Sequence, residues 1–404
     1  MAKLITTFSD SVVALSAFFF FFFLHHCPLR ANAAKYDVVE LGAIPGGKTD
    51  SSEAFLQAWK SACGSKGPAT IYVPSGRFLI EKPLEFTGPC KGGPIGIRID
   101  GTLVAPSDYK VIGGAYSWLS FRGVDGVSLS GGTLDGQGTG LWKCKDSSDS
   151  DCPTGASTLL FTNSKNIIIS RLSSLNSQMF HIVINNCKNV KVQGVKILAD
   201  GESPNTDGIH IQKSSDVTIL SSKIATGDDC VSITQGTSNV WVENVLCGPG
   251  HGISIGSLGK DLEEDGVQNV TVTSVTLKGT TNGVRIKSWG RPSNAFAKDI
   301  RFQHVVMSNV QNPIIIDQNY CPDNENCPGQ DSGVEVSNIT YEDIHGTSAT
   351  QVALKFDCSS ATPCTGIQLK DVKLTYKNRP AEASCVNADG TAKGVIQPAN
   401  CLGQ

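Results

Sequence analysis

Asn239-Val240-Trp241-Val242 and, one repeat later, Asn269-Val270-Thr271-Val272 belong to a short pattern that recurs through most of the chain. Each copy starts with Asn or Asp, or in the last two copies with Val or Gly, and continues with alternating apolar residues, which is typical of a strand with one buried face. The copies begin at Asn166, Asn189, Asp216, Asn239, Asn269, Asp299, Val334 and Gly366. Short strands repeated every ~20–30 residues predict stacked coils, because one coil alone cannot bury its apolar side.

A second set of short apolar runs lies between these copies, with Gly and Asn residues at the breaks. Its members lie at residues 181–184, 208–212, 230–233, 252–255, 283–287 and 313–316. An immunoglobulin-like sandwich or a jelly roll also has regularly spaced strands, but its strands need no such self-similarity. The sequence therefore predicts an all-β parallel β-helix.

The N-terminal end of such a solenoid needs a cap over its open core. Residues 51–62 read as an amphipathic helix, with Phe55, Ala58, Trp59 and Ala62 on one face. Asp50 or Ser51 is placed to cap it. We expect this helix to cover the first coil, with residues 35–41 as a strand leading in.

Acidic residues and a histidine precede three successive strands of the second set. They are Asp207, the pair Asp228-Asp229, and His251, spaced roughly one coil of the repeat apart. Adjacent coils lie about 4.8 Å apart, so these side chains should gather in one place. Clustered carboxylates suit acid–base hydrolysis of a glycosidic bond, and packing like charges together raises the pKa of at least one carboxyl.

The next coil adds two cations, Arg285 and Lys287. Side chains alternate along a strand, so if Ile286 packs inward both cations face outward, beside the acids. Singly, each of these residues has a plain explanation as a turn, loop or surface residue. Their position on consecutive coils favours a joint catalytic interpretation.

Residues 1–33 have the features of a secretory signal peptide. Lys3 supplies a positive charge, residues 12–24 form an apolar run, and Ala31-Asn32-Ala33 offers a cleavage pattern of small residues. A membrane anchor is the alternative, but the run is shorter than the ~20 residues that span a bilayer. We expect a secreted, extracellular protein with a single parallel β-helix catalytic domain at residues 34–404.

The chain carries a formal net charge of −3 and no basic stripe, so nucleic acid is not an expected partner. Neither a membrane nor a cofactor is expected, and the protein is expected to be a monomer. Two sequons, at Asn269 and Asn338, are candidate glycosylation sites.

Cysteines number 14, of which Cys27 falls in the predicted leader. A secreted chain favours disulfides, and an odd remainder implies a free thiol. The candidate pairs are Cys63/Cys90, Cys144/Cys152, Cys230/Cys247, Cys321/Cys327, Cys358/Cys364 and Cys385/Cys401. Cys187 is left as a reduced core residue, although sequence alone proves no connectivity. A zinc site is the weaker alternative, because its usual ligand spacings are missing.

Four motifs make a family resemblance specific. They are SPNTDG at 203–208, GDDC at 227–230, GHG at 250–252 and RIK at 285–287. In this order and spacing they resemble the signature motifs of the polygalacturonases, glycoside hydrolase family 28. The resemblance covers nearly the whole mature chain, and its plant secreted branch, with the pollen-type exopolygalacturonases, is the most similar.

The resemblance implies a right-handed parallel β-helix that hydrolyses α-1,4 bonds between galacturonic acid units of pectin in the cell wall, with inversion. By motif, Asp228 would be the general acid, and Asp207 and Asp229 would hold and activate water. His251 would maintain the protonation of the acid and orient it. Stacking puts the Cα atoms of Asp207 and Asp228 about 5 Å apart, whereas carboxyls of inverting enzymes lie roughly 6.5–9.5 Å apart.

The resemblance also assigns substrate binding to Arg285, Lys287 and Tyr320, with Asn205 lining the same cleft. A cation suits this task because every substrate unit carries a carboxylate. Leu141-Trp142 departs from the Trp-Trp pair of many plant endo enzymes, which favours exo action.

Three alternatives stay open. An endo-polygalacturonase differs only in how loops close the cleft, for which the stretches 144–152 and 321–327 are candidate walls. A pectate lyase would use the Asp-Asp pair as ligands for Ca²⁺. A wall-binding solenoid without catalysis is the third.

Overall fold

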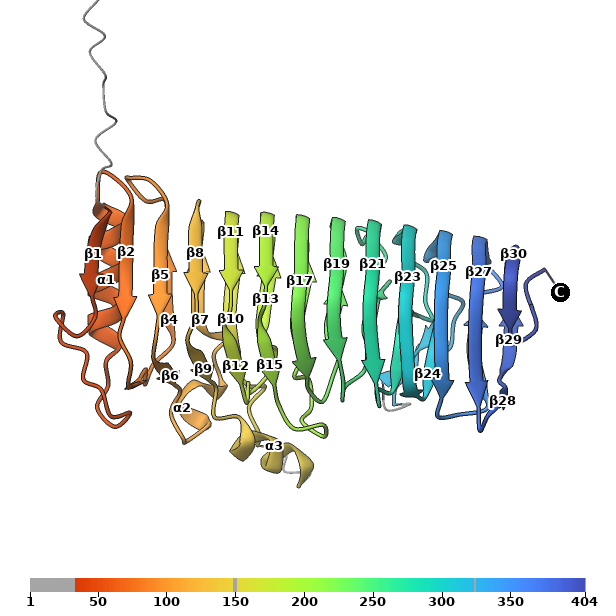
Figure 1. Cartoon of the computed structure of the whole chain (residues 1–404), viewed down its shortest axis with the longest axis horizontal. Coiled ribbons are helices and arrows are strands. Elements are labelled where there is room, and N and C mark those ends of the chain that lie inside the picture. Colours follow the sequence, from red (N-terminus) through yellow and green to blue (C-terminus); the bar gives the residue numbers. More distant parts are fainter. Residues whose placement is uncertain (1–32, 148–150, 323–324, 404) are drawn as a thin grey trace, which may run out of the picture. The chain divides into compact units, whose positions relative to one another are not determined.

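The computed structural model describes residues 33–147, 151–322 and 325–403. Apart from Ala33, the predicted signal peptide lies outside these residues. In the described part, two long parallel sheets run along the stack of coils, with one strand of each sheet contributed by almost every coil (Figure 1). This arrangement confirms the parallel β-helix and excludes a sandwich.

The smaller sheet carries the second set of strands and has 11 strands within the described residues, each parallel to the next. They are β4 (Leu84–Thr87), β7 (Ser117–Arg122), β10 (Ser157–Thr162), β13 (Ile182–Asn185), β16 (Ile209–Gln212), β18 (Val231–Ile233), β20 (Ile253–Leu258), β22 (Asn282–Trp289), β24 (Asn312–Tyr320), β26 (Val352–Asp357) and β29 (Glu382–Val386). Their inward residues, such as Ile209, Val231 and Ile253, are fully buried and stack from coil to coil.

The larger sheet carries the Asn-Val-x-Val repeats. Its main row is β1 (Ala34–Asp37), β2 (Ala69–Val73), β5 (Ile95–Ile99), β8 (Val127–Ser130), β11 (Lys165–Ser170), β14 (Lys188–Gln193), β17 (Ser215–Ala225), β19 (Thr237–Cys247), β21 (Val267–Lys278), β23 (Phe296–Val310), β25 (Glu335–Ser348), β27 (Cys364–Tyr376) and β30 (Ala388–Gln397). A second row of short strands is β3 (Arg77–Leu79), β6 (Thr102–Val104), β9 (Thr133–Asp135), β12 (Ser173–Leu175) and β15 (Lys196–Leu198). From β17 onward one long strand supplies both rows, since β17 pairs with β14 and with β15. The two-residue β28 (Arg379–Pro380) closes the far end. The coils therefore begin at the first described residues, well before the repeat that the sequence made visible at Asn166.

The repeated Asn and Asp residues sit at one bend of successive coils. Asn166, Asn189, Asp216, Asn239 and Asn269 all have φ between 55° and 58°, the left-handed region that Asn and Asp tolerate better than other non-glycine residues. Their side chains also bond along the stack: the Asn239 amide donates to Asp216 at 3.0 Å, and the Asn269 amide donates to Asn239 at 2.7 Å. The repeat therefore reflects a backbone requirement and a hydrogen-bonded ladder.

One member of the repeat was assigned wrongly from sequence. The residue aligned with Asp299 is Asn338, with φ 55°, and its amide donates to Asp299 at 3.2 Å. Val334 instead precedes β25 and is fully buried. The intervening coil is longer because it carries the loop that begins at Cys321, and this broke the spacing on which the sequence assignment relied.

Helix α1 (Ser52–Gly64) covers the first coils, as predicted (Figure 1). Its buried face includes Phe55, Ala58 and Trp59, and the Trp59 ring lies 5.4 Å from that of Phe86. Asp50 accepts a hydrogen bond from the Ser52 backbone N–H at 2.9 Å, so the capping carboxylate precedes the helix by two residues. The lead-in strand is shorter than expected, because the chain turns after Asp37. Helices α2 (Lys110–Gly113) and α3 (Thr139–Asp146) lie together on one side of the coils.

All six predicted disulfides are present, and Cys187 is the free cysteine among the described residues. Burial raises the pKa of the Cys187 thiol to about 11, so this thiol stays neutral. Cys230 and Cys247 are both fully buried, and their bond ties the two sheets together inside the core.

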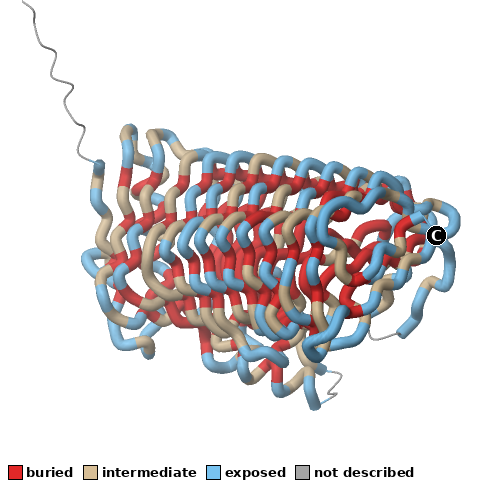
Figure 2. The backbone as a smooth tube through the Cα atoms, turned by 45° about the vertical axis from the view of Figure 1, so that its right-hand side comes forward, coloured by how far each residue is buried: buried red, intermediate tan, exposed pale blue. Residues whose placement is uncertain are grey.

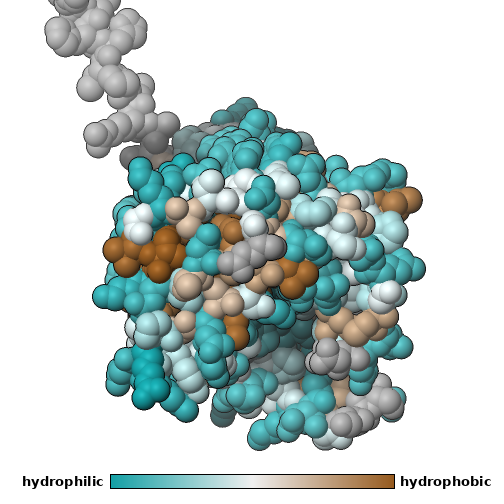
Figure 3. All heavy atoms as spheres, turned by 90° about the vertical axis from the view of Figure 1, so that its right-hand side faces the viewer, coloured by the Kyte–Doolittle hydropathy of each residue, from teal (hydrophilic) through white to brown (hydrophobic). Residues whose placement is uncertain are grey.

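Buried residues follow the inside of the coils, and exposed residues follow the turns (Figure 2). The face at the C-terminal end is largely hydrophilic, with a few scattered hydrophobic residues (Figure 3). Within the described ranges, no helix has the length and apolar character needed to cross a bilayer.

Candidate active site

A cleft of about 740 Å³ lies over the smaller sheet, across β16 to β24. Every residue that the sequence nominated lines it: Asn205, Asp207, Asp228, Asp229, His251, Arg285, Lys287 and Tyr320. The structure thus brings all eight side chains into one place. Their roles stay predictions.

Parallel register sets the positions of the acids. Ile209, Val231 and Ile253 are aligned partners on successive coils. Asp207, Asp229 and His251 each stand two residues before those partners, and so lie at equivalent levels of the stack. Asp228 lies one residue earlier and faces the open cleft.

The glycines of the motifs allow the coils to approach at this edge. A Cβ atom on Gly208 would come within 2.6 Å of the Cys230 carbonyl oxygen. A Cβ atom on Gly252, whose φ is +87°, would come within 2.1 Å of the Asn282 carbonyl oxygen. Any side chain at these two positions would push the acid-bearing turns apart.

Asp229 is a buried carboxylate held by two cations. Arg285 Nη2 donates to Oδ1 at 2.9 Å, Lys287 Nζ donates to Oδ2 at 2.9 Å, and Ser254 Oγ donates to Oδ1 at 2.7 Å. Burial alone would raise the pKa of Asp229, but the charges of Lys287 and Arg285 lower it to about 2. Asp229 is therefore an anion throughout the physiological pH range.

Arg285 and Lys287 do share a face with the acids, and Ile286 packs inward at 1 % exposure, as the alternation predicted. They are not simple surface cations, however. Their side chains are only 11 % and 9 % exposed, and both hold Asp229. Burial acts to lower the pKa of Lys287, but the negative groups around it, Asp229 foremost, together outweigh burial and raise the pKa.

Asp207 has neutral or titratable partners instead. Ser232 Oγ donates to its Oδ2 at 2.6 Å, and His210 Nδ1 lies 3.1 Å from the same oxygen. Burial, and then the charge of Asp228, raise the pKa of Asp207, against the opposing effect of His210. The His210 ring stacks on Phe180, with 4.3 Å between ring centroids and 4° between the planes.

Sequence reasoning missed His210, Ser232 and Ser254. They form one row on the outer face, since His210 is paired in register with Ser232, and Ser232 with Ser254. The sequence does contain a pattern that could have identified them: each is the single polar residue between two apolar residues, as in Ile209-His210-Ile211. In a strand with a buried face, such a position points outward, toward the acids.

Asp228 is the most accessible of the three carboxylates. Its side chain is 18 % exposed, against 8 % for Asp207 and 2 % for Asp229. His251 Nδ1 lies 3.0 Å from Asp228 Oδ1, and this hydrogen bond, opposed by burial, raises the pKa of His251. With its side chain 39 % exposed, His251 connects Asp228 to solvent.

One wall of the cleft comes from the loop after β24. Tyr320 stands beside the cations, with Lys287 Nζ 5.0 Å from its ring centroid, and Cys321 and Pro322 continue the wall. Cys321 and Pro322, the first residues of the stretch 321–327 that the sequence suggested as a wall, therefore border the cleft. The described part of the 144–152 stretch supplies no lining residue.

Asp228, Asp229 and His251 are the only described group of three or more candidate ligands close enough to hold a metal ion, with their ligand atoms within 4.8 Å of one another. Both oxygens of Asp229 are already bound by cations. A Ca²⁺ ion there would meet two positive charges at close range, so this donor set suits a divalent ion poorly. That disfavours the calcium-dependent lyase.

Three carboxylates, a histidine and two cations on the outer face of a parallel β-helix define a glycoside hydrolase of the solenoid type. The family model of Glycosyl hydrolases family 28 matches residues 63–396, and the chain belongs to this family. This is the same family that the four sequence motifs resemble, so the resemblance is confirmed.

The chain is 64 % identical over 372 residues to a polygalacturonase from Prunus persica, covering 92 % of this chain and 94 % of that protein. It is 42 % identical over 379 residues to an exopolygalacturonase from Platanus acerifolia, covering 92 % and 98 %. Among solved structures, an endo-xylogalacturonan hydrolase from Aspergillus tubingensis is similar, with a TM-score of 0.77 at 24 % identity. That likeness covers 89 % of this chain and all of the other, and supports the right-handed parallel β-helix.

The opposite environments of Asp207 and Asp229 give a stability test. Because the folded-state pKa of Asp207 is raised, its ionised form destabilises the fold at neutral pH, and Asp207→Asn should raise Tm at pH 7. The gain should vanish below the unfolded pKa of about 3.9, where Asp207 is protonated in both states. Calorimetry of the variant and the unmodified protein at pH 7 and near pH 3 measures this difference in Tm.

The matched variant Asp229→Asn should do the reverse. The folded-state pKa of Asp229 is lowered, so its charge stabilises the fold at neutral pH, and its loss leaves Arg285 and Lys287 without a partner. Tm at pH 7 should fall. Equal losses for both variants would contradict the assigned environments.

Proposed function

We propose that this chain hydrolyses α-1,4 bonds between galacturonic acid units of pectin or polygalacturonate. The observation that carries the proposal is the unequal setting of three clustered carboxylates, one anionic, one easily protonated and one open to the cleft. The polygalacturonase relatives support the substrate class. The buried cations beside the acids suit a substrate with one carboxylate on every sugar.

In this mechanism Asp228 is the general acid and protonates the oxygen of the leaving sugar. It is the carboxyl with the greatest access to the cleft, and its partner His251 returns a proton from solvent after each turnover. A water molecule attacks the anomeric carbon from the opposite side, its hydroxyl joining the carbon and its proton passing to a carboxylate. The product has inverted configuration.

Asp207 is the better acceptor for the proton of the water. Its raised pKa favours taking a proton, whereas Asp229, with a pKa of about 2, is a weak base that orients the water as a fixed anion. Ser232 and His210 hold Asp207 in position for this step. The sequence assigned activation of water to both residues equally, and the geometry supports this division.

In this proposal, Arg285 and Lys287 donate hydrogen bonds to Asp229 and to the substrate at the same time. A guanidinium has five N–H donors and an ammonium has three, so each can hold Asp229 and still donate to a substrate carboxylate. Tyr320 and Asn205, which also line the cleft, would contact the sugar rings.

Exo action is the narrower part of the proposal. The Platanus acerifolia relative is an exopolygalacturonase, and the Cys321–Cys327 loop stands at the cleft, where a wall would limit binding to a chain end. Secretion to the cell wall and action as a monomer belong to the same proposal; the six disulfides support an oxidising compartment. Asn269 and Asn338 are exposed, and their glycosylation stays a prediction.

Asp228→Asn tests the mechanism. The variant should fold, because the Asp228 side chain is partly exposed and, among the described residues, bonds only to His251 and to the neighbouring backbone N–H. Its kcat on polygalacturonate should fall at least about 10²-fold, since proton donation to the leaving group is lost. Asp146→Asn, an exposed carboxyl at the end of α3, is the control and should keep full activity. A folded Asp228→Asn enzyme with normal turnover would remove Asp228 from the mechanism.

The mode of cleavage is tested by the earliest products from polygalacturonic acid. A cleft closed at one end should release mainly monomeric galacturonic acid, and viscosity should drop slowly because chains shorten only from an end. Chromatography and viscometry on the same digest measure both. A fast viscosity drop with mixed oligomers would assign endo action and leave the catalytic residues unchanged.

A further inference from the structure

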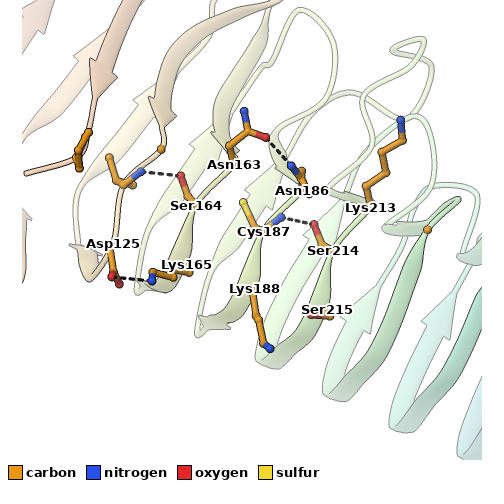
Figure 4. Close-up of a pocket in the computed structure, with 14 residues that line it drawn as sticks. Asp125, Asn163, Ser164, Lys165, Asn186, Cys187, Lys188, Lys213, Ser214 and Ser215 are labelled. Carbon is orange, nitrogen blue, oxygen red and sulfur yellow. Dashed lines mark hydrogen bonds and ion pairs between the residues drawn. The ribbon is translucent and has the colours of Figure 1, made fainter.

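A second hollow, of about 760 Å³, lies away from the cleft and shares no lining residue with it. It follows the turns that lead from the smaller sheet to the larger one, over several successive coils (Figure 4). Both hollows border the same strands: Asp207 precedes β16, and Lys213 directly follows it. The groove and the catalytic acids thus lie at opposite ends of four-residue strands, roughly 20 Å of extended chain apart.

Three lysines line this groove. Lys165 and Lys188 are aligned partners on adjacent coils, and Lys213 extends from the other rim (Figure 4). Lys165 Nζ lies 3.3 Å from Asp125, which balances its charge. In the described part of the chain, neither Lys188 nor Lys213 forms an ion pair, so these two ammonium groups carry the uncompensated charge of the groove.

The floor of the groove is rigid and uncharged. Ser164 Oγ accepts from the Val124 N–H at 3.1 Å, and Ser214 Oγ accepts from the Cys187 N–H at 3.0 Å, so each serine fixes a neighbouring coil. The Cys187 thiol, with a pKa raised to about 11, adds no negative charge. The hollow is therefore preformed, and a ligand would meet no carboxylate in its floor.

Amide groups complete the lining. The Asn186 amide donates to Asn163 Oδ1 at 2.6 Å. No other described residue bonds to the Asn163 amide hydrogens or to the Asn186 side-chain oxygen, so both can bond to a ligand. Hydroxyl groups of a sugar can bond to both. Ammonium groups on two rims with amides between them suit a ligand that combines negative charge with many hydroxyls.

We propose that this groove is a second, non-catalytic binding site for the galacturonate polymer, with Lys188 and Lys213 holding its carboxylates. The inference rests on the proposed substrate. A polymer segment bound here keeps neighbouring segments near the cleft, which raises their effective concentration there. A short oligomer cannot engage both sites at once, so the groove matters for the polymer alone.

The first experiment measures binding without turnover. In the Asp228→Asn background, Lys188→Glu/Lys213→Glu should weaken binding to polygalacturonate by about fivefold, the scale of an exposed ion pair, and added salt should shrink the difference. The matched control is Lys60→Glu/Lys66→Glu, the same charge change on and beside α1, where both lysines are exposed. The control should bind normally. Equal binding by all three proteins would overturn the proposal.

The second experiment uses the active enzyme. Lys188→Glu/Lys213→Glu should keep its kcat/KM on trigalacturonate and lose about fivefold on the polymer. An equal loss on both substrates would place the effect in the cleft or the fold and contradict the groove. If the unmodified enzyme cleaves neither substrate, the proposed function itself fails, and that result is distinct from failure of the groove.

Discussion

The parallel register of the coils is the constraint on which the rest of this structure depends. Each strand of the smaller sheet bonds to the next at matched residues, so any position repeats about every 4.8 Å along the solenoid. A shift of one residue in one coil would move every outward side chain into the core. The same register aligns the Asn ladder on one bend and the acids on another. Glycines at 208 and 252 keep the acid-bearing turns close enough for that alignment.

Such stacking creates an electrostatic problem, because it brings carboxylates together. Each of the three acids has a different partner, and these partners reduce the repulsion between the carboxylates. Asp229 has two cations, Asp207 has a serine and a histidine, and Asp228 has a histidine that reaches solvent. In the proposed mechanism, these three like charges thereby become a fixed anion, a proton acceptor and a proton donor. The environment of the three residues, and not their type, separates the tasks.

The fold and the clustering of the acids could be predicted from the sequence because both follow from periodicity, whereas Asn205 and Tyr320 were assigned by the family resemblance alone. Apolar alternation and the recurring Asn revealed individual coils from Asn166 onward, whereas the earlier coils lack that Asn and could not be located one by one. The repeat start was misplaced at Val334 because an inserted loop lengthens that coil, and the spacing between repeats then no longer predicts where the next strand begins. The pairing of Arg285 and Lys287 with Asp229, and the support of Asp207 by His210, depend on side-chain directions across coils, which spacing does not specify.

The stereochemistry of the reaction tests the central claim, that Asp228 donates a proton while Asp207 and Asp229 hold a water molecule. Proton NMR during the first moments of hydrolysis reports the anomeric form of the newly made reducing end, before mutarotation mixes the two forms. The account predicts that the β-anomer appears first from the α-linked substrate. Initial release of the α-anomer would show retention, which requires a carboxylate nucleophile, and would contradict the assignment of these three residues.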